Sequence, residues 1–236
     1  WLIFFILTLV VLYTFSRSGV IALGFSILAL LILSIYFGFL KKVVPLIVIL
    51  VLTSAVVFVS DRTPKSLLDR ARSVFSTSEK STIAHRLLLS GEIELFLQNP
   101  ILGVGYGGFS EKFRATDYGA EHLKIDHNPQ IRLPAHSVWF EALTETGLVG
   151  IIPYSIFMIS VLIYLFKFIK QTSNRIIKPY CIGIFSGIVG VLAGGLFYSY
   201  NLELFWFIIF LGILFPLSVK VLFKEKLIFE EKIASE

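Results

Sequence analysis

Three side chains suited to anion binding and proton transfer lie at the edges of apolar segments. His136 stands where a polar segment returns to apolar sequence, and all four histidines fall between residues 85 and 136. Arg17 interrupts two apolar runs, and Arg86 lies in the polar segment. Two guanidinium groups can hold phosphate oxygens through paired hydrogen bonds, and an imidazole exchanges protons near neutral pH. Together these residues predict an anion site with a general base.

Two further groups of polar residues have competing interpretations. Glu141 and Glu145 are four residues apart and share a helix face, so they either face water or Glu145 positions a substrate hydroxyl. His122 and His127 flank Asp126, but their spacing fits neither ligands on one helix nor a zinc finger. We therefore expect a solvated loop at the two histidines, and no metal site.

The glycines at 103–108 match the pattern G-x-G-x-x-G. A dinucleotide-binding loop requires a strand before this pattern and a helix after it. Here Asn99 and Pro100 end an expected helix immediately before it. The pattern therefore favours a tight turn over a dinucleotide site.

Hydrophobic residues make up 56% of the 236 residues. Because lipid offers no partners to backbone polar groups, apolar runs approaching roughly 20 residues predict spanning helices. The fold class is therefore expected to be all-α, a polytopic transmembrane bundle, and Cys181 is expected to pack in its core. The first run is short and begins without Met, so we expect a longer protein. Six spans are predicted at 1–15, 19–40, 43–60, 147–166, 180–199 and 203–222.

These spans divide the chain into four parts. Residues 1–60 form three transmembrane helices with an arginine-bearing outer link, 61–146 an outer loop domain, 147–222 three more transmembrane helices, and 223–236 a cytoplasmic tail. Lysine and arginine gather after the second, fourth and sixth spans, and the positive-inside rule makes that side cytoplasmic. Arg17 then stands in a short outer link, where it either has a function or simply extends into water.

The outer domain is expected to be mainly helical. Residues 62–75 suit a surface helix, and 82–97 suit a helix that ends at Asn99-Pro100. Residues 110–134 are expected to be irregular, and a new helix is expected to open near His136 and run through Glu145 to the fourth span. The domain mixes basic and acidic residues, which argues against nucleic acid as a partner.

Three blocks of the chain, in this order, resemble the O-antigen ligase and O-antigen polymerase family. Residues 14–19, TFSRSG, resemble its T-x-S-R-S/G-G signature. Arg86 followed by 99–109, NPILGVGYGGF, resembles its R and P-hydrophobic-x-G-x-G-x-x-x-F block. Residues 135–150, AHSVWFEALTETGLVG, resemble its A-H-N/S block with E-x-G-hydrophobic-x-G. The resemblance covers roughly residues 10–215.

The resemblance implies a GT-C type glycosyltransferase that needs neither metal nor cofactor. It would move a glycan from an undecaprenyl-(pyro)phosphate donor to lipid A core, a growing polysaccharide or a protein. Arg17 and Arg86 would bind the phosphate or pyrophosphate of the donor. His136 would act as general base on the acceptor hydroxyl or help to orient it, with Glu145 and Ser16 as supporting residues. The enzyme would lie in the bacterial cytoplasmic (inner) membrane, with its site facing the periplasm or cell exterior.

Two alternatives remain. A polysaccharide polymerase of the same family would carry the same patterns as a ligase. A transporter or flippase for a lipid-linked anion would belong to another class. Charged residues inside spans mark transport paths, and the predicted spans are nearly free of charge, which weakens the second alternative.

Overall fold

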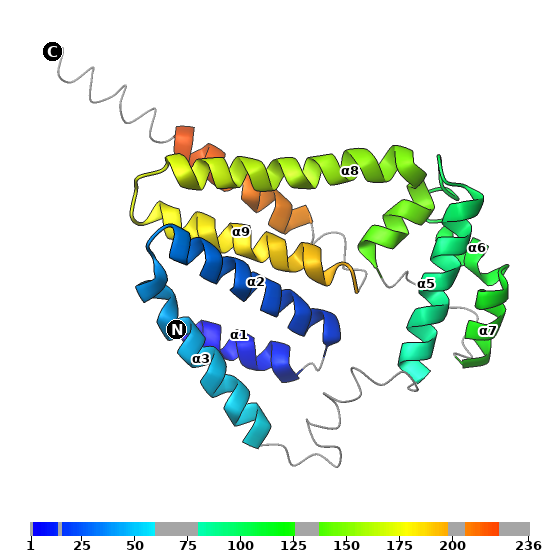
Figure 1. Cartoon of the computed structure of the whole chain (residues 1–236), viewed down its shortest axis with the longest axis horizontal. Coiled ribbons are helices and arrows are strands. Elements are labelled where there is room, and N and C mark those ends of the chain that lie inside the picture. Colours follow the sequence, from blue (N-terminus) through cyan, green and yellow to red (C-terminus); the bar gives the residue numbers. More distant parts are fainter. Residues whose placement is uncertain (1, 14–15, 60–79, 126–136, 198–205, 222–236) are drawn as a thin grey trace.

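The computed structural model describes residues 2–13, 16–59, 80–125, 137–197 and 206–221. Every regular element in these ranges is a helix, which confirms the all-α prediction for the described part of the chain (Figure 1). The apolar helices are α1 (Leu2–Tyr13), α2 (Arg17–Tyr36), α3 (Leu40–Val59), α8 (Val138–Gln171), α9 (Ile177–Gly194) and an unlabelled helix at Trp206–Val221.

The protein is a multi-pass membrane protein. Three of its described helices are long and apolar enough to cross a bilayer, namely Ser18–Tyr36, Val138–Gln171 and Ile177–Gly194. The helix Trp206–Val221 is apolar but shorter. Each of the six predicted spans overlaps a described helix. Six crossings of the membrane are not confirmed, because three of the described helices have the length and hydropathy that a crossing needs.

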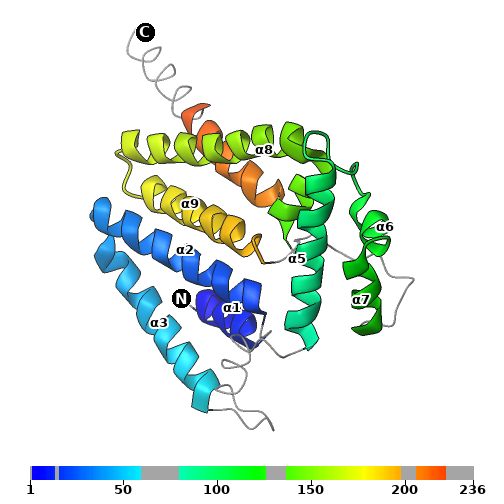
Figure 2. The same cartoon turned by 45° about the vertical axis from the view of Figure 1, so that its right-hand side comes forward.

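The membrane helices pack around two apolar clusters, and α2 lies antiparallel along α9 (Figures 1 and 2). Gly190 of α9 touches Ala22 and Ser26 of α2 so closely that a Cβ atom would collide with both. Small residues allow such an approach between helices in lipid. Cys181 is fully buried, which confirms its predicted packing role. The clusters consist of Met158, Val161, Leu165, Ile188 and Ile209, and of Leu33, Phe168, Ile169, Cys181 and Ile182.

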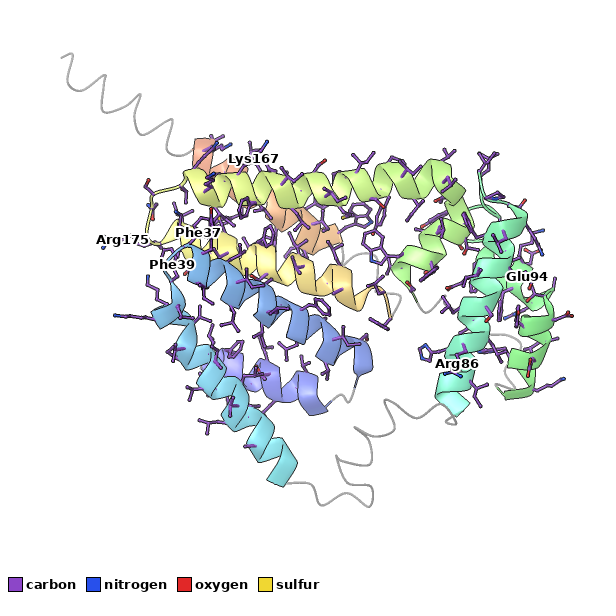
Figure 3. All side chains as sticks on the ribbon, in the orientation of Figure 1. Phe37, Phe39, Arg86, Glu94, Lys167 and Arg175 are labelled. Carbon is purple, nitrogen blue, oxygen red and sulfur yellow. The ribbon has the colours of Figure 1, made fainter. Side chains whose placement is uncertain are left out.

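Basic residues from separate links share one end of the bundle. Figure 3 shows Lys167 and Arg175 at the end that carries Phe37 and Phe39, opposite Arg86 and Glu94. The ammonium group of Lys178 lies 5.0 Å from the ring centre of Phe37, which joins the start of α9 to the end of α2. The ammonium group of Lys42, near the start of α3, lies 5.3 Å from the ring centre of Phe39, so basic residues that flank two separate links share this end.

The described part of the predicted outer domain, residues 80–125, is called the outer segment below and lies at the opposite end of the bundle. It contains α5 (Lys80–Gln98), α6 (Phe109–Arg114) and α7 (Asp117–Ile125), and α5 runs across the direction of α8 in both views (Figures 1 and 2). The helix predicted at 82–97 is therefore confirmed, while the surface helix predicted at 62–75 lies outside the described residues. A small core joins α5 to α6 and consists of Leu88, Leu95, Phe109 and Phe113.

Two sequence predictions for this segment are wrong. Residues 110–125 are mostly helical rather than irregular, because Thr116 caps α7 by accepting a hydrogen bond from the Gly119 N–H at 3.1 Å. His122 does not lie in a solvated loop. It is buried on α7, where its ring meets Phe113 edge-on at 5.9 Å between centroids. His127 lies outside the described residues.

Candidate active site

The first element of the candidate site is the start of α2. Ser16 caps this helix, since its hydroxyl accepts a hydrogen bond from the Gly19 N–H at 3.2 Å and lies 3.0 Å from the hydroxyl of Ser18. Arg17 is the first residue of α2, and its side chain lies outside the described part of the structure. The cap gives Ser16 a structural role, and the positive end of the α2 dipole faces the side of the bundle where the outer segment lies.

The second element is the start of α8 at Val138. This start agrees with the helix that the sequence predicts near His136. Ser137 caps α8 by accepting a hydrogen bond from the Phe140 N–H at 3.3 Å. Its hydroxyl also donates to the carbonyl of Gly195 at 3.1 Å, and the Val138 N–H donates to the same oxygen at 2.9 Å. His136 itself lies outside the described residues, but its chain neighbour is fixed to the end of α9.

A third contact strengthens this attachment. The indole N–H of Trp139 donates to the carbonyl of Leu192 at 3.0 Å. Carbonyls at the end of a helix have no partner within the helix, so the first residues of α8 satisfy groups that α9 leaves open. Because α9 runs antiparallel to α2, the end of α9 that holds Ser137 is also the end nearest Arg17 (Figures 1 and 2). Two blocks that are far apart in sequence therefore lie at the same end of the bundle.

Arg86 comes from the outer segment. It is exposed on the N-terminal half of α5, and the buried Leu87 and Leu88 that follow it set the rotation of this helix. Figure 3 places Arg86 on the part of α5 nearest the bundle's lower half, where α2 begins. The hydroxyl of Thr144 on α8 donates to the carbonyl of Glu92 at 3.1 Å, which ties α5 to α8.

The glycine loop, residues 99–108, is hydrogen-bonded to a break in α8. At the break Gly147 has φ 61° and ψ −161°, so its backbone is not helical. The N–H groups of Val104 and Gly105 donate to the carbonyls of Thr144 and Glu145 at 2.9 and 3.0 Å. In return, the Leu148 N–H donates to the carbonyl of Pro100 at 2.9 Å. The loop thus joins both halves of α8.

Glu145 completes this junction with its side chain. The residue is only 5% exposed, so the expectation that it faces water is wrong. One carboxylate oxygen accepts a hydrogen bond from the Gly107 N–H at 2.9 Å, and the other accepts one from the Phe109 N–H at 3.2 Å. Glu145 therefore holds the end of the glycine loop and the start of α6.

Sequence reasoning missed that the two glycine-bearing blocks contact each other. Gly103 has φ 71°, and a Cβ atom there would collide with the backbone of Glu145. A Cβ atom at Gly147 would collide with the backbone of Ile101. Positive φ and close backbone contact are what glycine permits. The available signal was a glycine that breaks an otherwise continuous helical pattern directly after Glu145 and Thr146.

The glycine loop has no dinucleotide-binding context, since the helix α5 precedes it and the described residues contain no strand. Within the described ranges, no three His, Cys, Asp or Glu residues are grouped so that they could hold a metal ion.

A family model described as O-antigen ligase matches residues 2–155. The chain belongs to the O-antigen ligase family. The match includes the start of α2, Arg86, the glycine loop and the break in α8, so the family relation covers every site residue predicted from the sequence. Membership in the O-antigen ligase family makes the protein a glycosyltransferase-type enzyme of polysaccharide biosynthesis. Searches of curated proteins and of solved structures find no match.

Proposed function

We propose that the protein transfers a glycan from an undecaprenyl-(pyro)phosphate donor to an acceptor at the outer face of the bacterial cytoplasmic membrane, without a metal ion. The acceptor is lipid A core, a growing polysaccharide or a protein. The observation that carries the proposal is that two family blocks lie at the same end of the bundle. There the start of α2 and the start of α8 lie at the end of α9.

The donor phosphate would bind between Arg17 and Arg86. The N-terminus of α2 adds the positive end of a helix dipole, which favours an anion at this position. Charge develops on the phosphate oxygen as its bond to the sugar breaks, and fixed guanidinium groups stabilise that charge in the transition state. In this proposal the two arginines supply the positive charge that a metal ion would otherwise provide.

His136 would act on the acceptor. Its imidazole would take the proton of the acceptor hydroxyl while the hydroxyl oxygen attacks the anomeric carbon of the donor sugar. The bond between the anomeric carbon and the phosphate oxygen breaks, and the lipid (pyro)phosphate leaves. Ser137 and Trp139 support this role because their hydrogen bonds to Gly195 and Leu192 fix the chain directly after His136.

The distribution of charge supports the outward orientation of the site. Lysines 167 and 178 and Arg175 gather at the end of the bundle away from α5, and basic residues of short loops stay cytoplasmic. The candidate site then faces the periplasm or the cell exterior.

The proposal is tested by complementing a host that lacks surface polysaccharide with the full-length protein and with His136→Ala, Arg17→Ala and Arg86→Ala. Arg175→Ala is the matched control, because Arg175 is an exposed arginine at the opposite end of the molecule. Wild type and Arg175→Ala should restore the glycan, while the three site variants should lower it at least a hundredfold at equal membrane levels. Activity of all three site variants at the wild-type level would refute the proposed site.

The size of the restored glycan distinguishes the remaining alternatives. A ligase restores attachment of preformed chains, whereas a polymerase of the same family lengthens them.

A flippase moves an intact lipid-linked glycan and releases no free lipid (pyro)phosphate. Assaying the release of this product by purified protein with donor and acceptor therefore separates transport from transfer.

A further inference from the structure

The glycine loop exposes large apolar side chains at its outer surface. Leu102 and Tyr106 are 72% and 83% exposed, and Ile101 and Leu97, at the end of α5, are also exposed. The cluster formed by Leu97, Ile101, Leu102 and Tyr106 is called the loop face below. Grouped apolar side chains on an otherwise polar segment mark a contact surface.

The loop face continues the lipid-facing surface of α8. The N–H groups of Leu148 and Val149 donate to the carbonyls of Pro100 and Ile101 at 2.9 and 3.1 Å, so the loop lies directly on the first turn after the break. Figure 1 shows the link between α5 and α6 beside the bend of α8. From this turn a stripe of exposed apolar residues runs along the spanning helix at helical spacing, formed by Leu148, Val149, Ile152, Ile156, Ile159 and Ile163.

Charge is absent from the loop. Residues 99–110 contain no Asp, Glu, Lys or Arg, whereas Glu94 precedes them and Glu111 and Lys112 follow. A water-facing link of this length ordinarily carries charge, and transferring a charge into the edge of a bilayer is costly. The uncharged stretch ends where α6 leads away from the spanning helix.

The glycines of the loop and their neighbours on the side facing α8 have hydrogen-bonded N–H groups in spite of the irregular path of the chain. An irregular segment that touches lipid must satisfy its polar groups internally, because acyl chains offer no partners. The Gly103 N–H donates to the carbonyl of Asn99 at 2.9 Å, and Pro100 has no N–H. Carbonyls of the loop and of α8, and the Glu145 carboxylate, accept from Val104, Gly105, Gly107, Gly108 and Phe109.

We propose that the loop face inserts into the membrane and that its partner is the acyl chains of bilayer lipid. Leu97, Ile101 and Leu102 enter the boundary between headgroups and acyl chains in the leaflet at this end of the bundle, and Tyr106 lies at headgroup level. The outer segment is thereby held at a fixed depth, with α5 along the membrane surface. This inference depends on the membrane location of the chain and is independent of the proposed glycan transfer.

A spin label tests the insertion in the full chain, reconstituted in phosphatidylcholine–phosphatidylglycerol nanodiscs. Cys181 is buried, so labelling is directed to an introduced cysteine, and the unsubstituted protein measures any residual signal. Leu102→Cys is compared with Ile156→Cys on the α8 stripe and with Glu121→Cys, which is exposed on α7. Accessibility to oxygen reports lipid, and accessibility to a water-soluble nickel chelate reports solvent.

The label at Leu102→Cys should favour oxygen severalfold over the nickel chelate, as at Ile156→Cys, while Glu121→Cys should show the reverse. The substituted side chain is largely exposed, so folding should survive, and Ile101→Cys provides an independent position with the same expected result. A label as open to nickel as that at Glu121→Cys would place the loop face in water. A label shielded from both reagents would show that protein, such as a second copy of the chain, covers it. Either result would overturn the proposal.

Discussion

Glu145 holds two backbone N–H groups with one buried carboxylate, so both its charge and its acceptor atoms matter to the glycine loop. A hydrogen bond to a charged group contributes about 1.5–3 kcal/mol, and a buried N–H left without a partner is costly. In Glu145→Gln an amide NH₂ group replaces one of the two carboxylate oxygens. This NH₂ group cannot accept a hydrogen bond, so it faces a backbone N–H group donor to donor.

We expect Glu145→Gln to lower the free energy of unfolding by about 2 kcal/mol, and Glu145→Ala by more, because alanine leaves both N–H groups without their acceptor. The protein is heated in the presence of a fluorescent maleimide, which reacts with the buried Cys181 only once unfolding exposes it. The temperature at half-maximal labelling gives the unfolding midpoint. Glu121→Gln is the control, since Glu121 is exposed on α7. Equal midpoints for Glu145→Gln and Glu121→Gln would show that the carboxylate does not stabilise the loop.

The surroundings of Glu145 show what residue patterns can and cannot predict. The spacing of Glu141 and Glu145 predicted that they share a helix, and α8 contains both. Their burial was not predictable from this spacing, because the groups that bind Glu145 lie 36 and 38 residues earlier in the chain. A carboxylate that pairs with backbone N–H groups needs no basic partner, so charge patterns do not reveal it.

At the scale of elements, the junction of the glycine loop with the break in α8 needs glycine for two reasons. One is a positive φ angle, and the other is a lack of room for a Cβ atom. Gly103 and Gly105 both have positive φ, at 71° and 98°. A Cβ atom at Gly103 would also collide with the backbone of Glu145, whereas a Cβ atom at Gly105 meets nothing within 4 Å. The two positions separate backbone strain from steric exclusion.

We expect Gly105→Ala to cost about 1–2 kcal/mol, the strain of positive φ alone. Gly103→Ala should cost clearly more, because it adds a collision with backbone that cannot rotate away. The same Cys181 maleimide assay ranks the two variants against wild type. If both lowered the unfolding midpoint equally, close packing of the loop on α8 would not contribute to stability.

The short helices α6 and α7 show why an element can escape prediction. The prolines at 129 and 134 suggested irregular structure, but they lie beyond the end of α7 at Ile125. Thr116 as a cap, followed by Asp117 in the first turn, is a local start signal that was present in the sequence. The helix α6 has only six residues, which is too few for its sequence to show a helical period.

At the scale of the whole molecule, apolar runs located the membrane helices but not their neighbours. A helix that is apolar on all sides has no hydrophobic face to indicate what it packs against, because lipid and protein both suit the same side chains. Gly187 and Gly190 of α9 look equivalent in sequence. Around Gly187 a Cβ atom would meet nothing within 4 Å, whereas at Gly190 it would collide with Ala22 and Ser26 of α2.

This difference predicts how the bundle positions the candidate site. Gly190→Leu should push α2 away from α9, and with it the Arg17 end of α2 from the Ser137 attachment at Gly195. Overpacking of this kind costs about 1–3 kcal/mol, so the protein should still insert while glycan restoration falls at least tenfold. Gly187→Leu adds the same side chain to an open face of the same helix and should retain both the wild-type midpoint and the wild-type glycan level. Loss of glycan in both variants would trace the defect to the leucine itself, and full activity of Gly190→Leu would mean that the α2–α9 contact does not set the geometry on which transfer depends.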